Sequence, residues 1–363
     1  DQPNVIPELE VSFVQDAGDF LGGRLDADIS FLGLRREGSD QDLNRLSLRT
    51  GWDRRFVSGH GLVSDFEAYV HGDAYNIRDI GLDNETKTEG RVYPVANLKT
   101  EYPIARSFDG YQVMLAPVAG VTLAPDLNES DEDDIPNEDS LDVKLDSTNL
   151  FEASRFPGLD RVEDDIKATY GLRAGVYGDG GSHTEAFIGQ SYRFDDEDNP
   201  FESGSGLTRQ RSDFVGSISA DISSKYFLDY RFQMDGNSLE SERHELSAAA
   251  SFGKLGLSSQ YFYDRSYSAA ALTSPNDDGS REQLDSSLSY YIRPDLRFRV
   301  SGRYDLGEDQ GLRKADFGLD YFGQCLSLSS TLSRNLTDDA SGESSTEFTF
   351  SITLKNIGSF AGQ

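Results

Sequence analysis

The sequence is poor in the residues that would cross-link a chain or anchor it by a helix. Its 363 residues include one cysteine, Cys325, so no disulfide can close within the chain. It has no run of about 18 apolar residues, which excludes a transmembrane helix but not membrane-spanning strands, since barrel strands alternate apolar and polar residues. The chain starts at Asp1 without an apolar leader, so we expect a mature or trimmed fragment.

Positive charge is also scarce. The chain has 34 Lys and Arg against 64 Asp and Glu, a formal net charge of -30. Phosphate backbones are bound by Lys and Arg surfaces, so we expect no nucleic-acid partner. An acidic chain can be disordered. Here, however, 22 Phe and 17 Tyr favour strands, and 35 Gly supply turns. The composition therefore favours an all-β protein.

Apolar and polar residues alternate along many segments, which is the period of a β-strand. In 227–234, Leu228, Tyr230, Phe232 and Met234 share one face, and Asp229 and Arg231 lie on the other. In 295–304 the polar face carries Arg297, Arg299 and Arg303, and near the C-terminus the apolar face carries Phe348, Phe350, Ile352 and Leu354. Each such strand has one apolar and one polar face.

This pattern predicts about seventeen strands. They lie near 7–15, 22–36, 42–56, 61–78, 90–106, 110–123, 165–177, 181–194, 211–223, 225–235, 241–253, 255–268, 281–293, 295–307, 311–323, 325–336 and 343–357. Short turns alternate with long polar connections, which is typical of an outer-membrane barrel and less so of a soluble or secreted β-sandwich. We therefore predict a large antiparallel transmembrane β-barrel.

The expected barrel also has an orientation. Bacterial barrels end in the periplasm, so alternation puts the long connections outside the cell. Because bacterial barrels have an even number of strands, an odd count means either that one strand is miscounted or that the first strands are absent. The chain opens directly into a strand at 7–15, which favours absent strands.

Few residues suggest catalysis or metal binding. The histidines are His60, His71, His183 and His244, and none has a metal-ligand spacing to another His or to Cys325. The sequence has no GxSxG elbow and no P-loop. The run from Asp126 loosely resembles the start of a calcium loop but lacks its central Gly and final Glu. We expect no enzyme activity, catalytic residue, metal site or cofactor.

The connection at 124–164 is long enough to indicate a function. A loop that is only solvated would not need Leu150, Phe151, Phe156 and Leu159, so we expect it to fold inward as a plug, with Arg155 and Arg161 paired to acidic neighbours. The plug residues that we predict are Asn137, Asp139, Asn149, Phe151, Arg155, Phe156, Pro157, Gly158, Asp160 and Arg161.

Several segments together resemble one family. The loop carries "IPNEDS" and "TNLFEASRFPGLDRVE", and "ATYGLR" follows in the next predicted strand. Other segments are "GGRLDADISFLGLRREGSD", "RLSLRTGWDRRFVSGHGLV", 111-YQVMLAPVAGV-121, 189-GQSYRF-194, 321-YFGQCLSLSSTLSRN-335 and 348-FTFSITLKNIGSF-360. They are similar to the C-terminal barrel of the lipopolysaccharide-assembly protein family LptD, also called OstA. The resemblance implies that residues 1–363 are the C-terminal portion of that barrel, without the periplasmic N-terminal domain and the first strands.

The resemblance also implies a function. Lipopolysaccharide would enter the outer leaflet through a lumen, lined by Asp229, Arg231, Arg297, Arg299 and Arg303, and a lateral seam beside the last strand with Phe348, Phe350, Ile352 and Leu354. The implied partners are lipopolysaccharide, a plug lipoprotein like LptE, a periplasmic bridge protein like LptA and outer-membrane lipids.

The resemblance gives Cys325 a role as well. Family cysteines of this segment form a disulfide to the periplasmic domain. This chain has one cysteine where some relatives have an adjacent pair, and a free thiol at a strand end is the alternative. For the whole chain, the alternative functions are a diffusion porin or other outer-membrane receptor, and a surface adhesin.

Overall fold

The fold is described from a computed structural model of the chain. It describes residues 4–36, 42–80, 85–125, 135–139, 143–194, 199–223, 225–265, 280–307, 310–337, 344–354 and 358–362.

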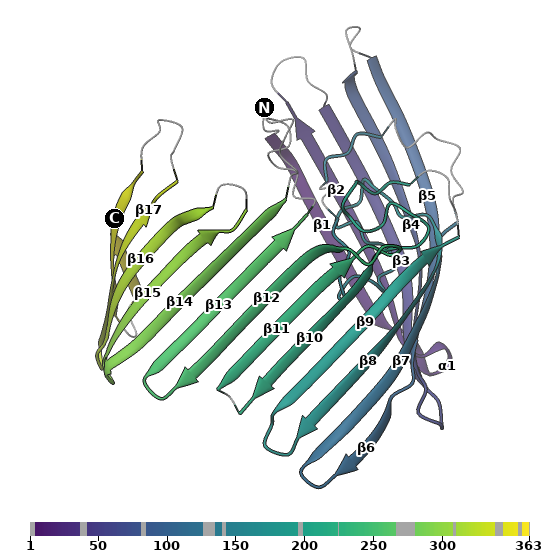
Figure 1. The fold of residues 1–363 in the computed structure, drawn as a ribbon. Coiled ribbons are helices and arrows are strands. Elements are labelled where there is room, and N and C mark those ends of the chain that lie inside the picture. The colour runs from purple at the N-terminus through teal and green to yellow at the C-terminus, as the bar shows by residue number, and fades with distance from the viewer. Residues whose placement is uncertain are drawn as a thin grey trace. The chain divides into compact units, whose positions relative to one another are not determined.

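The described residues form strands almost throughout (Figure 1). The strands are β1 (Asn4–Asp16), β2 (Arg24–Arg35), β3 (Asp42–Val57), β4 (Val63–Ile80), β5 (Glu85–Glu101), β6 (Ile104–Phe108), β7 (Tyr111–Leu123), β8 (Ile166–Gly178), β9 (His183–Arg193), β10 (Phe214–Ile222), β11 (Tyr226–Met234), β12 (Ser241–Phe252), β13 (Leu255–Asp264), β14 (Arg281–Arg293), β15 (Leu296–Asp305), β16 (Gly311–Phe322), β17 (Leu326–Asn335), β18 (Thr346–Leu354) and β19 (Gly358–Gly362). The short helix α1 (Gly18–Leu21) joins β1 to β2. Within these ranges no helix is long and apolar enough to span a bilayer.

The chain divides into two compact units. The first contains residues 1–104, 115–173 and 189–213, and the second contains residues 105–114, 174–188 and 214–363. In the first unit β1 to β5 pair antiparallel in chain order, and β7 pairs with β5 through Ala96↔Leu123 to Glu101↔Val118. In the second unit β10 to β19 pair antiparallel in chain order. The predicted all-β antiparallel fold is confirmed.

Among the described residues nineteen strands stand where about seventeen were predicted, and the two additional strands are β6 and β19. The strand expected at 90–106 ends at Glu101, and β6 begins after Pro103. The strand is interrupted there because proline has no N–H to donate to a sheet. The strand expected last, at 343–357, is β18, but β19 follows and pairs with it from Phe350↔Gly362 to Leu354↔Gly358. The edge of β18 that we expected at a seam is therefore partly occupied by β19.

The connections alternate in length only in part, because 36–41, 81–84, 235–240 and 306–310, at the end where long connections were predicted, have only four to six residues. Short turns occupy 58–62, 179–182, 223–225, 253–254, 294–295 and 323–325, whereas the intervening connections include 124–165, 194–213, 265–280 and 336–345. In an antiparallel sheet such alternation puts short turns at one end of the strands and long loops at the other.

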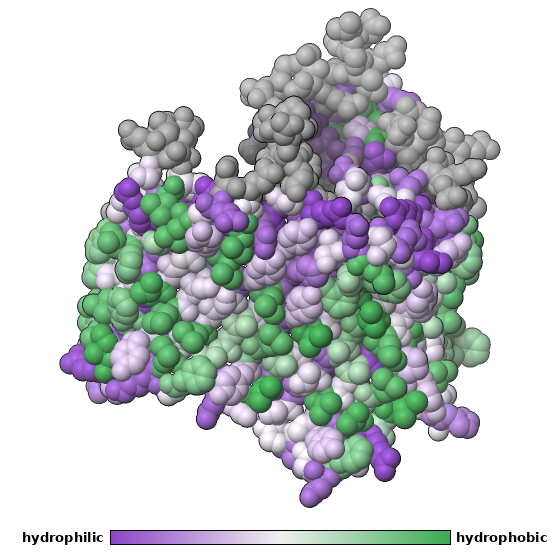
Figure 2. All heavy atoms as spheres, viewed as in Figure 1, coloured by the Kyte–Doolittle hydropathy of each residue, from purple (hydrophilic) through white to green (hydrophobic). Residues whose placement is uncertain are grey.

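The two faces of the strands have the reverse of a soluble protein's polarity. On β3, Leu46 and Leu48 are each 50% exposed, whereas the alternate residues Arg45 and Ser47 are 8% and 2% exposed. On β5, Val92 is exposed in the same way. Figure 2 shows apolar residues spread over the outer surface of the strands. An apolar outer face with charged residues beneath it suits a sheet surrounded by lipid.

The outward position of Phe350 can be tested in the full-length protein. Phe350 is 40% exposed on β18, and the neighbouring Thr349 points to the opposite face. We expect Phe350→Arg to lower the amount of folded barrel, because a lipid-facing Arg near the midplane costs about 2–4 kcal/mol. The matched control is Thr349→Arg. Heat-modifiable electrophoresis should show less folded protein for Phe350→Arg alone; equal amounts for both variants would contradict the assignment of faces.

Candidate functional site

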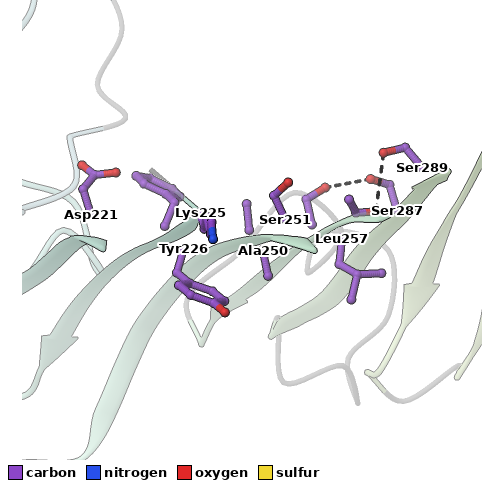
Figure 3. Close-up of a pocket in the computed structure, with 12 residues that line it drawn as sticks. Asp221, Lys225, Tyr226, Ala250, Ser251, Leu257, Ser287 and Ser289 are labelled. Atoms are coloured by element: carbon purple, nitrogen blue, oxygen red, sulfur yellow. Dashed lines mark hydrogen bonds between the residues drawn. The ribbon is translucent and has the colours of Figure 1, made fainter. Parts of the chain in front are cut away.

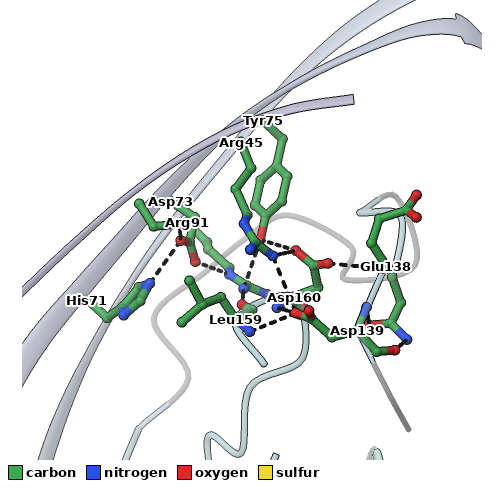
Figure 4. A network of polar contacts seen from close by, with 11 residues as sticks. Arg45, His71, Asp73, Tyr75, Arg91, Glu138, Asp139, Leu159 and Asp160 are labelled. Atoms are coloured by element: carbon green, nitrogen blue, oxygen red, sulfur yellow. Dashed lines mark hydrogen bonds and ion pairs between the residues drawn. The ribbon is translucent and has the colours of Figure 1, made fainter. Parts of the chain in front are cut away.

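The candidate site is the loop after β7, which lies against the polar face of the first unit's strands. Its first anchor is Asp160 (Figure 4). The Asp160 carboxylate accepts hydrogen bonds from Arg45 of β3 at 2.5 Å and from the Tyr75 hydroxyl of β4 at 3.1 Å. Arg91 of β5 donates to the backbone oxygens of Asp160, at 2.7 Å, and Leu159. Three neighbouring strands thus bind one short piece of the loop.

Asp139 fixes the conformation of this piece. Its Oδ2 accepts the backbone N–H groups of Leu159 at 2.7 Å and Asp160 at 2.9 Å, and lies 3.3 Å from Arg45 Nη1. A Cβ atom at Gly158 would lie 2.1 Å from the Asp139 Cγ, so this approach requires glycine. The two ends of the loop are therefore held together by a carboxylate that caps its backbone.

Asp73 supports the anchor from the strand side. Its carboxylate accepts hydrogen bonds from Arg91 Nε at 2.9 Å and from the Ser47 hydroxyl at 2.5 Å, and lies 2.8 Å from His71 Nε2. The His71 ring stacks on Tyr93 with centroids 4.9 Å apart. Because each polar group here has a partner, the guanidinium of Arg91 is fixed in orientation before it meets the loop.

A second anchor surrounds Glu163, whose side chain is 1% exposed. It pairs with Arg155 Nη1 at 3.0 Å and with Lys167 Nζ of β8 at 2.6 Å. Lys167 also donates to the backbone oxygen of Ala153 at 2.9 Å, and Arg155 donates to the hydroxyl of Ser191 on β9 at 2.9 Å. Removing one partner of such a buried pair costs about 3–5 kcal/mol, because the other charge is left uncompensated.

Apolar contacts fill the space between the anchors. The loop residue Ile135 packs in a buried cluster whose strand members are Leu34, Leu43, Tyr75 and Ile77. Ala153 and Val162 of the loop pack in a second cluster, with Tyr93, Val95 and Ala124. Leu150 is completely buried. This burial stabilises the packed loop in addition to its ion pairs.

The connection after β9 packs on the loop as well. The rings of Phe156 and Phe201 are stacked with centroids 4.8 Å apart. The backbone N–H of Leu145 donates to the backbone oxygen of Ser205 at 2.9 Å. Two connections of the first unit therefore form one packed body on the polar face.

The surroundings shift the pKa values of the loop carboxyls in different directions. Burial raises the pKa of Asp160 above its usual range, although Arg45 opposes this. Burial also acts on Asp139, but there the backbone N–H groups of Asp160 and Leu159 prevail and the pKa is lowered. Glu163 is buried, yet Arg155 and Lys167 hold its pKa below the usual range. Glu163 and Asp139 are therefore ionised at neutral pH.

The other predicted plug residues occupy varied positions. Asn137 donates to the backbone oxygen of Asp139 at 2.8 Å, and Asn149 donates to that of Lys144 at 2.8 Å. The ring of Phe151 packs over Gly120, and Pro157 is exposed. Arg155 pairs with Glu163 as expected, whereas no ion pair of Arg161 is found among the described residues.

The residues expected to line a lumen lie on the polar face of the second unit. Arg297 and Arg299 pair with Asp320 at 2.9 and 2.7 Å. Arg303 pairs with Asp285 at 2.9 Å, and Arg231 pairs with Asp229 at 3.2 Å. Pairing between neighbouring strands, and within β11 for Arg231 and Asp229, thus neutralises part of the charge on this face.

A shallow hollow of about 350 Å³ lies in the second unit near the short turns (Figure 3). Hydroxyl groups of Ser251, Ser258, Ser287 and Ser289 line it, and the Ser258 and Ser287 oxygens lie 2.7 Å apart. Small side chains there leave hydroxyl groups and backbone accessible.

The remaining predicted positions are less informative. Cys325 is an exposed free thiol between β16 and β17. Within the described ranges no three His, Cys, Asp or Glu residues cluster as metal ligands. The calcium-like run from Asp126 to Asp134 lies outside those ranges.

Sequence reasoning missed the strand side of the site. Arg45, Tyr75 and Arg91 bind the loop, and Asp73 holds Arg91, yet none of the four was predicted. The available signal was the charged residues on the polar face of the strands in "LNRLSLR" and "YVHGDAY". These segments do not indicate which residues those charges contact.

An apolar outer face, buried charges and long connections at only one end of the strands define a β-protein of the bacterial outer membrane. The family described as "LptD: LPS transport system D" matches residues 1–296. The chain belongs to the LptD family, and its location is the outer membrane of a Gram-negative bacterium.

The relatives are distant. The chain is 25% identical to the LPS-assembly protein LptD of Acinetobacter baumannii over 260 residues, which cover 71% of this chain and 30% of that protein. It is 26% identical to LptD of Neisseria gonorrhoeae over 278 residues, covering 73% and 33%. The chain thus spans about a third of the length of these relatives.

Likeness to solved structures is weak. One is the alcaligin outer-membrane receptor FauA of Bordetella pertussis, with a TM-score of 0.40, 11% identity and coverage of 98% of this chain and 65% of that one.

The tight approach at Gly158 can be tested by substitution in the full-length protein. Gly158→Ala should loosen the loop, because the added methyl group would overlap the Asp139 carboxylate that caps it. Limited proteolysis of intact cells should then cut within 135–165 faster than in the wild type. Gly59→Ala, at a turn with no atom within 4 Å of the new Cβ, is the control. Equal cleavage of both variants would show that the close contact does not hold the loop.

Proposed function

We propose that this chain is the C-terminal barrel portion of an outer-membrane translocon that assembles lipopolysaccharide into the outer leaflet. The observation that carries the proposal is the family match over residues 1–296. The relatives are named LPS-assembly proteins, and this chain covers only part of their length. Their role is therefore extended here to a segment of such a protein.

The packed loop would serve as an extracellular plug on the lumen side. A wide barrel that handles a large glycolipid needs its lumen closed to other solutes, and inward-folded loops are one solution. The anchors at Asp160 and Glu163 support this role, because each joins the loop to strands through buried charges. The plug would be a fixed part of the barrel wall rather than a loose lid.

The polar face of the second unit suits a sugar-bearing substrate. Its serine hydroxyls and paired charges offer hydrogen-bond donors and acceptors, as the saccharide part of a glycolipid requires. The apolar acyl chains would instead leave through a lateral seam. In the proposal, Phe348, Phe350, Ile352 and Leu354 of β18 lie near that seam, with β19 along part of the edge of β18.

The transport chemistry would be non-enzymatic. The barrel would offer a path, and the energy would come from the system that delivers the substrate. The partners that the family implies are a plug lipoprotein like LptE and a periplasmic bridge protein like LptA. A diffusion porin or receptor is the alternative, because an inward-packed loop also narrows porin lumens.

Depletion of the full-length protein in its host tests the translocon. We expect lipopolysaccharide to disappear from the cell surface and to accumulate at the inner membrane. Surface labelling with a lipid A probe and fractionation of the two membranes measure both effects. Restoration by the wild-type gene is the control. Unchanged surface lipopolysaccharide would count against the translocon, and single-channel conductance would then test the porin.

The single cysteine gives a second test. In the proposal Cys325 forms a disulfide to the periplasmic part of the full-length protein, where an oxidising compartment preserves such bonds. Non-reducing electrophoresis should show a mobility difference between wild type and Cys325→Ser that disappears on reduction. Identical mobility under both conditions would indicate a free thiol.

A further inference from the structure

The outward face of the first unit carries a groove of about 570 Å³. The strand register places Trp52 of β3, Ala68 of β4, Ala96 of β5 and Leu123 of β7 in one row across the sheet. The two alanines form a low floor between two bulky side chains. The groove therefore runs along β4 and β5, with a wall on each side.

Both the wall and the floor of the groove are held in place. The Trp52 indole donates to the backbone oxygen of Gly22 at 2.9 Å, and its ring packs on Phe66 with centroids 5.5 Å apart. On the opposite face of the same strands, Tyr69 and Val95 belong to the apolar cluster that contacts the loop. Because these contacts are made within the protein itself, little free energy would be spent on shaping the groove when a ligand binds.

The groove lies towards the short turns. Trp52, Phe56 and Phe66 stand close in sequence to the turn at 58–62, and aromatic side chains gather where a barrel leaves the hydrocarbon. Short barrel turns face the periplasm. The groove therefore opens into the periplasmic leaflet of the outer membrane, which is composed of phospholipids.

A cation stands at the turn end of the groove. Arg54 follows Trp52 by two residues on the same face and is paired in register with Phe66. Its neighbours Arg24 and Arg55 form ion pairs with aspartates at 3.1 and 2.6 Å. Arg54 instead donates to a backbone oxygen, and no ion pair joins it to a carboxylate among the described residues. Its guanidinium also lies over the Phe56 ring, 4.7 Å from the centroid. Neither contact neutralises the charge, so Arg54 can still pair with an anion at the membrane interface.

We propose that this groove binds an acyl chain of a periplasmic-leaflet phospholipid, with the lipid phosphate at Arg54. The apolar walls match the chain, and the guanidinium at the turn end matches the phosphate in charge and position. The loop packs on the inner face of β4 and β5, and the bound lipid would cover the outer face of the same strands. The proposal depends on the outer-membrane location and not on the transport role.

Photolabelling tests the site. The full-length protein is reconstituted in vesicles of phosphatidylethanolamine and phosphatidylglycerol with a phospholipid that carries a photoreactive acyl chain. We expect labelled peptides from β4 and β5. Ala68→Phe should lower this labelling roughly tenfold, the factor that corresponds to two unburied methylene groups. The control is Ala74→Phe, an exposed outward position further along β4, which should leave labelling unchanged. Heat-modifiable electrophoresis confirms folding, and Ala96→Leu is a milder replacement.

A second variant tests the contact between Arg54 and the lipid phosphate. Arg54→Gln should reduce labelling by the phospholipid but not by a diacylglycerol with the same photoreactive chain. Uniform labelling of the outer face that Ala68→Phe does not alter would overturn the site. Preferential labelling by a lipid A probe, or a cross-link between two protein copies across the groove, would assign it to another occupant and overturn the proposal as well.

Discussion

The fold depends on one constraint: strands with an apolar outer face carry a charged inner face, and every buried charge there needs a partner. Arg45 and Arg91 cannot be buried without carboxylates or carbonyl oxygens, because an unpaired buried charge is expensive. The loop supplies those groups through Asp160, Asp139 and its backbone. Strand and loop therefore depend on each other for their stability.

This dependence explains how residues 135–139 and 143–165 can pack in one conformation although they contain no helix or strand. Ordering each residue costs conformational entropy, which a solvated loop could not recover. Here the two anchors and the two apolar clusters supply the favourable free energy that offsets this cost, since these residues have no regular secondary structure. The Gly158 contact shows how closely the parts fit, since no larger residue leaves room for the Asp139 carboxylate.

The same packing connects the two faces of the sheet. Tyr69 and Val95 contact the loop cluster on one face, while Ala68 and Ala96 of the same strands form the groove floor on the other. A sheet supported on one side offers a fixed surface on its other side. The loop and the membrane-facing groove are thus properties of one set of strands.

The sequence by itself determined the fold class, because alternation, turn residues and connection lengths are local properties. It also indicated that the loop is more than a solvated connection, since apolar side chains such as Leu150 and Phe156 stabilise a fold only when they are buried. Only the tertiary structure decided what the loop meets. Arg45 and Asp160 are 115 residues apart, and no local pattern relates them. The break at Pro103 and the added strand β19 also lay beyond the period-two pattern, because strand ends depend on which neighbour is available for pairing.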